Sequence, residues 1–152
     1  MAQTTGAISF KAAKVEIGTT GTTAWSDISG TFNKVEVGGR ERAVGSIHTA
    51  DGDTPIVTRG KLSAADVTVT CVYTEVAGEA FKVVHDLFVA SGGTDFWIRW
   101  TPAGSATTYY RYTSGAGVIN SVTLPVGEVG AGTPVMFAFK VTAPSITQAT
   151  NS

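Results

Sequence analysis

Residues 76–91 read VAGEAFKVVHDLFVAS, and this stretch decides what the rest of the chain must form. At about 100° per residue of an α-helix, its apolar side chains fall on one side and its charged side chains on the other. Burying each large apolar side chain would contribute roughly 1.5–3 kcal/mol. We therefore predict a helix over about residues 76–91, ended by the SGG at 91–93. The side chains that would pack it on a sheet are Phe81, Val84, Leu87 and Phe88.

Length and composition predict a single domain over residues 1–152, because 152 residues is a common domain size. The chain is rich in Thr, Val and Gly, with 18 glycines and 15% charged residues, which favours many short strands joined by tight turns. So little charge also suggests that partners cover part of the surface. The lone Cys71 cannot form an internal disulfide, and we expect it to be a buried, inert thiol.

Charge and hydropathy exclude several function classes. The net charge is −1 and there is no run of Lys or Arg, whereas a nucleic-acid binder presents a basic stripe. The N-terminal residues lack the basic and apolar regions of a secretory signal, and no apolar run reaches the length of a membrane span. We expect no membrane partner and synthesis in a cytoplasm.

The remainder of the chain alternates in the manner of strands. The clearest case is residues 61–74, where Val67, Val69, Cys71 and Tyr73 share one face. The expected strands occupy residues 7–17, 32–37, 61–74, 95–101, 107–113, 117–123 and 134–142. The fold class is therefore mainly β, a β-sandwich or partly closed barrel with one flanking helix. Residues 1–5 and 143–152 are predicted to be flexible tails.

Residues 38–60, GGRERAVGSIHTADGDTPIVTRG, are too long for an ordinary loop in a compact domain. Asp51-Gly52 is a hairpin turn signal, and residues 44–49 and 55–58 would form the two strands. We interpret the segment as a long protruding arm. An isolated hairpin is marginal in water, so another subunit is expected to order it.

Chemistry-bearing residues are few. His48 and His85 are the only histidines, and no Ser/His/Asp or Cys/His set is present, so we predict no enzyme and no catalytic residue. Asp51-Gly52-Asp53 starts like a calcium loop but lacks the later ligands, and the glycine runs do not join a strand to a helix, so no metal and no cofactor are expected. The aromatic residues of 96–112 are assigned to core and interface packing.

The order of these elements resembles the tail tube proteins (major tail proteins) of long-tailed bacteriophages. The features that match are an early strand followed by Trp25-Ser26-Asp27-Ile28, the long arm after residues 32–37, and a strand leading into the helix. Behind the helix come the aromatic hairpin, residues 117–122, the Gly127-Glu128 loop and a last strand. The resemblance extends over nearly the whole chain.

The resemblance implies a structural virion protein of the tail, assembled in the host cytoplasm. Its subunits would form hexameric rings that stack into a hollow tube, with one sheet of each subunit joined to its neighbours around the channel. The implied partners are further copies of the chain, a tape-measure protein, a tail terminator and tail-tip proteins. Double-stranded DNA would pass through the channel transiently, which the scarcity of Lys/Arg clusters suits.

Residue roles follow as hypotheses. The arm carries charge in a charge-poor chain, so we expect it to make the contacts between rings and subunits. Those contacts are assigned to Arg40, Glu41, Arg42, His48, Asp51, Asp53 and Arg59. Glu36 and Asp66 are expected to line the channel. The alternative is an immunoglobulin-like or carbohydrate-binding β-sandwich module of a virion or adhesin, which the aromatic hairpin over residues 96–112 would serve.

Overall fold

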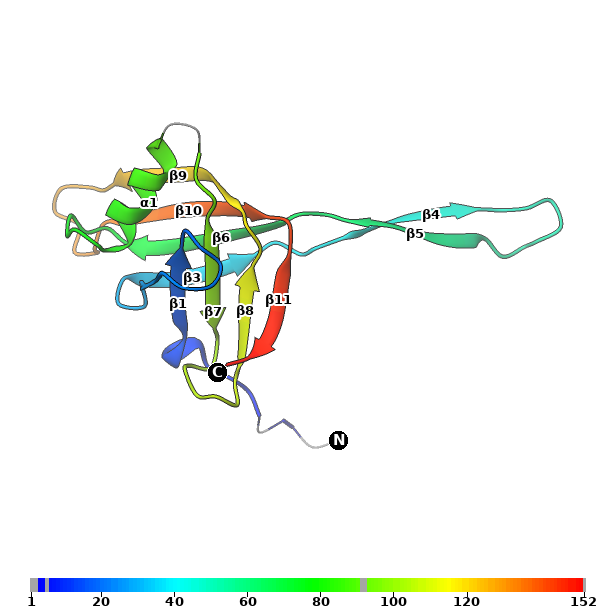
Figure 1. Cartoon of the computed structure of the whole chain (residues 1–152), viewed down its shortest axis with the longest axis horizontal. Helices are drawn as coiled ribbons and strands as arrows, with labels where there is room; N and C mark the ends of the chain where they lie inside the picture. The colour runs from blue at the N-terminus through cyan, green and yellow to red at the C-terminus, as the bar shows by residue number, and fades with distance from the viewer. Residues whose placement is uncertain (1–2, 5, 91–92, 152) are drawn as a thin grey trace.

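The computed structural model describes residues 3–4, 6–90 and 93–151. Its strands form two main sheets and a separate hairpin (Figure 1). Sheet A has the strand order β11 (Ile146–Thr150), β8 (Tyr110–Ser114), β7 (Trp97–Thr101), β1 (Lys14–Gly18) and β2 (Trp25–Asp27). Sheet B has the order β3 (Phe32–Val37), β6 (Ala65–Val72), β10 (Met136–Ala143) and β9 (Val118–Val126).

The two sheets face each other as a β-sandwich whose strands run across one another (Figure 1). Within residues 3–4, 6–90 and 93–151 all strand pairs are antiparallel and no barrel closes, so the sandwich form of the predicted fold class is confirmed. Alternate residues of β6 and β10 point inward and are buried, as the sequence pattern predicts. They meet the inner side of sheet A, for example where Phe96, the residue before β7, packs edge-on against Phe139 with ring centroids 6.0 Å apart.

Strands change sheets at two neighbouring corners, which explains how one chain builds both layers. β10 bends into β11 at Pro144 and Ser145, and β8 bends into β9 at residues 115–117. The corners touch, because the backbone N–H of Gly115 donates to the Ser145 carbonyl at 2.8 Å. A side chain at Gly117 would lie 2.7 Å from the Thr142 carbonyl oxygen, so the close approach requires glycine.

The helix α1 (Ala80–Val89) is shorter than the predicted 76–91. Gly78 has φ +88°, which is outside the right-handed helical region, so the chain turns there and the helix starts after it. At the other end Ala90 is already extended, with φ −60° and ψ 131°. The predicted stop at Ser91 and Gly92 lies outside the described residues, and Gly93 has φ +70°.

The buried side of α1 is also turned relative to the prediction. Val84 is fully buried, and Phe81 and Leu87 pack against the core. Phe88, however, is 43% exposed, so its assignment to the core contact is wrong. Val83 packs on the core in its place. The reason is that α1 lies at one end of the sandwich, where it approaches inner residues of both sheets, instead of lying flat on one sheet.

Two segments at the ends of the chain differ from expectation. Residues 143–152 were expected to be a frayed tail, but Ile146–Thr150 form β11 and pair in register with β8. Near the N-terminus, the expected strand over residues 7–17 is reduced to β1, preceded by a 3-10 turn, η1 (Phe10–Ala12). Within the described part of the chain, no helix combines the length and hydropathy of a membrane-spanning segment.

Candidate assembly interface

The arm is a two-stranded hairpin that projects far from the sandwich, formed by β4 (Arg42–Ile47) and β5 (Ile56–Leu62) (Figure 1). The predicted protruding arm over residues 38–60 is therefore confirmed. It extends sheet B along the direction of its strands: β3 leads into β4, and β5 leads into β6. Backbone bonds continue between the two, with the Gly38 N–H donating to the Asp66 carbonyl and the Ser63 N–H to the Glu41 carbonyl, each at 2.8 Å.

Apolar side chains on the arm are exposed, although Val and Ile are buried in the core of the sandwich. Within the described chain no other segment covers either side of this hairpin. Apolar residues left open in this way are typical of surfaces that bind a partner. The exposed fractions are 66% for Val44, 67% for Ile47, 53% for Ile56, 61% for Val57 and 44% for Leu62.

The register of β4 and β5 gives the arm two chemically different faces, because directly paired residues lie on the same side. Val44 pairs with Arg59 and Ser46 with Val57. We call this the valine–cation face. The other face carries the Ile47–Ile56 pair and the Gly45–Thr58 pair, and none of these four residues is charged.

The charged residues assigned to assembly contacts divide into two groups. Arg40 and Arg42 make hydrogen bonds within their own chain: Arg40 links the base of the arm to the Ser63 and Pro144 carbonyls at 3.3 and 3.2 Å, and Arg42 donates across the hairpin to the Gly60 carbonyl at 3.1 Å. The others are exposed, with Glu41 at the base, Arg59 on the valine–cation face, and the tip residues His48, Asp51 and Asp53 beyond the paired strands.

Glu36 and Asp66, the residues assigned to the channel, both lie on the outer face of sheet B. Their strand neighbours Val35 and Val67 point into the core, so the alternation of the strand turns both carboxylates outward. Glu36 pairs with Lys34 at 2.7 Å, and Asp66 pairs with Lys140 at 3.7 Å and accepts a hydrogen bond from Thr142 at 2.6 Å. The face therefore carries balanced charge among Thr, Ser and Asn side chains.

The outer face of sheet A has a different character, with a tight ionic cluster. Arg99 donates to Glu16 at 2.6 Å and lies 4.2 Å from the centre of the Trp25 ring, while Lys14 contacts Glu16 at 2.9 Å. Burial alone would raise the pKa of Glu16, but hydrogen bonds and charge from Arg99 and Lys14 outweigh it and lower that pKa. This cluster satisfies its own charges and stabilises the sheet.

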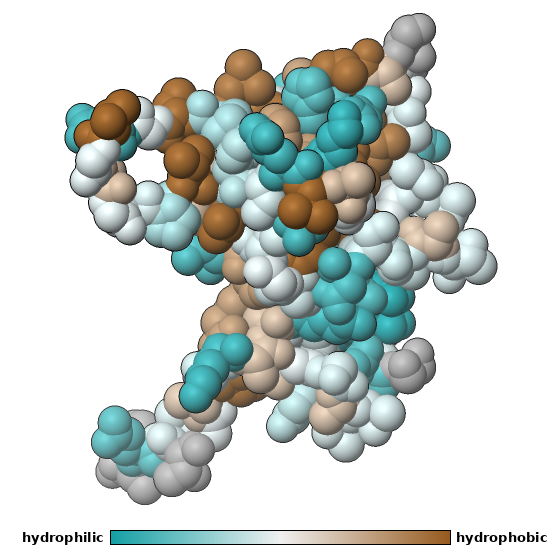
Figure 2. Space-filling model, turned by 90° about the vertical axis from the view of Figure 1, so that its left-hand side faces the viewer, coloured by the Kyte–Doolittle hydropathy of each residue, from teal (hydrophilic) through white to brown (hydrophobic). Residues whose placement is uncertain are grey.

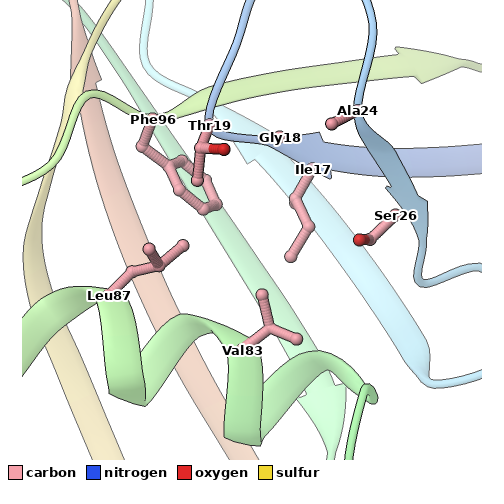
Figure 3. Close-up of a pocket in the computed structure, with 8 residues that line it drawn as sticks. All are labelled: Ile17, Gly18, Thr19, Ala24, Ser26, Val83, Leu87 and Phe96. Atoms are coloured by element: carbon pink, nitrogen blue, oxygen red, sulfur yellow. The ribbon is translucent and has the colours of Figure 1, made fainter.

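A cavity of about 130 Å³ lies between α1 and sheet A (Figure 3). Val83 and Leu87 point from the helix toward Ile17 and Phe96 across it. The polar side chains in its lining are the hydroxyls of Thr19 and Ser26, with no titratable group. Among the described residues no three His, Cys, Asp or Glu side chains gather as metal ligands. The cavity offers space between packed elements but no catalytic set.

The aromatic hairpin is partly internal and partly exposed. Phe96 and Trp100 are buried, and Trp100 stacks on Tyr112 at 5.6 Å. Tyr109 and Tyr110 are exposed and line a second hollow of about 220 Å³, with Ile8 and Pro102. The set is thus divided between core and surface and does not form one flat platform.

The apolar side chains of the arm are not among the contact residues predicted from the sequence. The predicted contacts are charged residues, since charge is scarce in the chain. The available signal was the sequence of residues 44–47 and 56–57, VGSI and IV, which is core-like strand sequence in a segment predicted to protrude.

No protein-family model matches the chain, and no curated protein is similar to it in sequence. Solved structures are similar across nearly the whole chain. A chain of the PVC sheath–tube complex, an extracellular contractile injection system, has a TM-score of 0.75 at 11% identity, covering 96% of this chain and 93% of that one. A chain of the SPP1 tail tube has a TM-score of 0.66 at 12% identity, covering 95% and 80%.

A third similar structure is the tail of a gene transfer agent particle, refined with C6 symmetry. Its TM-score is 0.63 at 10% identity, and the match covers 99% of this chain and 100% of that one. At these identities the likeness establishes the fold and nothing finer. The chain has the fold of tail tube proteins.

Proposed function

We propose that the chain is a structural subunit of a phage tail tube, built from hexameric rings that stack into a hollow cylinder. The observation that carries the proposal is the arm, whose apolar side chains are exposed on both faces. A hairpin open on two sides needs cover from other chains, and identical subunits supply it when they contact each other head to tail. The C6 symmetry of the similar gene transfer agent tail supports the ring number.

Sheet B is the sheet we assign to the channel wall. Its edge strands β3 and β9 lack a second strand partner in the described chain, so copies placed side by side can continue the sheet. Its outer face carries Lys34, Glu36, Asp66 and Lys140, and each of the two lysines has an acidic partner. A duplex held by unpaired cations would stick to the wall, because each phosphate contact adds affinity. A balanced face suits the transient passage of DNA.

The partners and location follow from this role. We assign the chain to the tail of a virion, assembled in the host cytoplasm, with the tape-measure protein inside the tube and terminator and tail-tip proteins at its ends. The similar PVC and anti-feeding prophage structures include a tube terminator and a tube-terminating cap, which supports end-capping partners for this tube. We assign it no enzymatic activity.

Electron microscopy of the purified protein tests the proposal. For the wild type we expect long hollow tubes with six-fold rings in end view. The control is a Lys34→Gln, Lys140→Gln variant, which should still form tubes. A protein that stays monomeric over a wide concentration range would overturn the proposal. Monomers that also bind glycans would favour the carbohydrate-binding module, with the hollow beside Tyr109 and Tyr110 as its site.

A further inference from the structure

The end of sheet B opposite the arm carries a second group of exposed apolar side chains. It is formed by the loop before α1 and by the end of β9 with the glycine-rich loop that follows, at the left of Figure 1. Figure 2 looks at this end, and hydrophobic residues gather over its upper half with hydrophilic ones between them. We define the distal patch as Val76, Leu124, Val126, Val129 and Val135, which are 57%, 59%, 79%, 108% and 39% exposed.

Acidic side chains surround the distal patch. Glu75 precedes Val76, Glu79 precedes the helix, and Glu128 lies between Val126 and Val129. None of the three has a cationic partner among the described residues; Glu75 and Glu79 accept hydrogen bonds from Tyr73 and Thr74. Lys82 is nearby, but it pairs with Asp86 at 3.4 Å. This end of the molecule is therefore apolar and acidic.

The valine–cation face of the arm has the complementary composition. Val44 and Val57 are exposed beside Arg59, and Arg59 has no acidic partner within the part of the chain that the structure covers. The two surfaces lie at opposite ends of sheet B, so one chain cannot bring its own surfaces together (Figure 1). A second copy, displaced along the strands of sheet B, brings them together.

We propose that the valine–cation face of one copy docks on the distal patch of the next copy along the tube. This inference rests on the proposed function and names the surface that receives the arm. Because the two surfaces differ, the contact is heterologous, and because they lie at opposite ends of the molecule it repeats along the tube instead of closing into a ring, which is what stacking requires. The valines lose water on contact, and Arg59 opposite Glu128 fixes the register and excludes mismatched pairings.

A charge-reversal series tests the pairing through tube formation. Arg59→Glu and Glu128→Arg are each expected to abolish tubes at protein concentrations at which the wild type forms them, because each places like charges together. The combined variant restores the opposite signs and is expected to restore tubes. The matched control is Lys11→Glu, an exposed residue on η1 outside both surfaces, which should leave tubes intact.

Cysteine cross-linking tests the contact directly. Burial raises the pKa of the Cys71 thiol to about 12, so this native cysteine does not compete. A Val57→Cys, Val129→Cys variant is expected to give an oxidative ladder of multimers, since each copy donates one thiol at each end. The same variant without oxidant, and each single variant under oxidation, should give no ladder.

The outcomes separate the two proposals. If the wild type forms tubes but the cysteine variant gives no ladder, the docking is overturned and the tail-tube function stands. The same holds if the wild type and both charge-reversed variants all form tubes fully. If the wild type forms no tubes under any condition, both proposals fail.

Discussion

β6 and β5 are neighbours in the chain and both are rich in β-branched residues, but they differ in what covers them. In β6 the side chains of Val67 and Val69 are fully buried between two sheets. In β5 Ile56 and Val57 are more than half exposed. The free energy of burial that stabilises β6 is available within the chain, whereas for β5 it becomes available only on contact with another molecule. The sandwich thus covers its apolar side chains within one chain, whereas the arm leaves them exposed.

Removing the arm is the most severe test of this comparison. A chain lacking residues 43–58, closed by a short glycine linker, should form no tubes. Its free energy of unfolding should change by less than about 1 kcal/mol, because no core side chain is removed. Electron microscopy checks the first expectation and urea denaturation the second. Tubes of normal length from this variant would contradict the division of roles.

A core substitution should give the opposite result, losing stability first. Phe139 is 1% exposed and packs against both Phe96 and Phe137. Phe139→Ala should lower the free energy of unfolding by about 3–5 kcal/mol, through lost burial and the cavity left behind. Urea denaturation of the variant under conditions that keep it monomeric measures the effect. A loss below about 1 kcal/mol would mean that the sandwich does not depend on this core.

The ionic cluster on sheet A should contribute less, and its contribution should depend on pH. Glu16→Gln is expected to cost about 2 kcal/mol at pH 7, because the hydrogen bond that a charged Arg99 donates is weakened. The pKa of Glu16 is lowered from 4.5, so this stability is present above pH 4.5 and is lost as the pH falls through the folded-state pKa.

The check is to follow wild type and Glu16→Gln together from pH 7 to pH 3. Their free energies of unfolding should converge at acid pH. A difference that stays constant over this range would show that the carboxylate charge is not what matters at this site.

The smallest expected effect is the change in the free energy of unfolding of the monomer when an arm side chain is truncated. Ile47→Ala removes a side chain that is 67% exposed, so the free energy of unfolding should change by less than about 0.5 kcal/mol. Thermal unfolding of the monomer measures it. A loss comparable to that of Phe139→Ala would show that the arm is covered within the monomer, which the structure does not allow.

Local sequence patterns predicted those elements that can be identified from their own residues, without knowledge of the strand they pair with. The alternation of residues 61–74 and 134–142 identified β6 and β10 with the correct inner faces, and Asp51-Gly52 identified the arm. β11 was missed because Ile146–Thr150 is a short strand whose partner, β8, is more than thirty residues earlier, and its corner depends on contact with Gly115. No local pattern reports such a contact.

The orientation of α1 was missed for a related reason. Its sequence shows an apolar stripe, but which part of the stripe is buried depends on where the two sheets end, and that turns the helix toward Val83 and away from Phe88. For the interface, the sequence located the arm but not the residues that need cover. An apolar side chain looks the same in sequence whether its partner belongs to its own chain or to another.

The continuity between the arm and sheet B also has a mechanical consequence. Only Ser63 and Ala64 separate β5 from β6, and the backbone bonds from Gly38 to Asp66 and from Ser63 to Glu41 bridge the junction. A pull on the arm is therefore transmitted along β6, parallel to the strand, and loads the hydrogen bonds to β3 and β10 in shear, many at once. A subunit pulled through its arm would therefore resist extension through many strand hydrogen bonds that bear the load together.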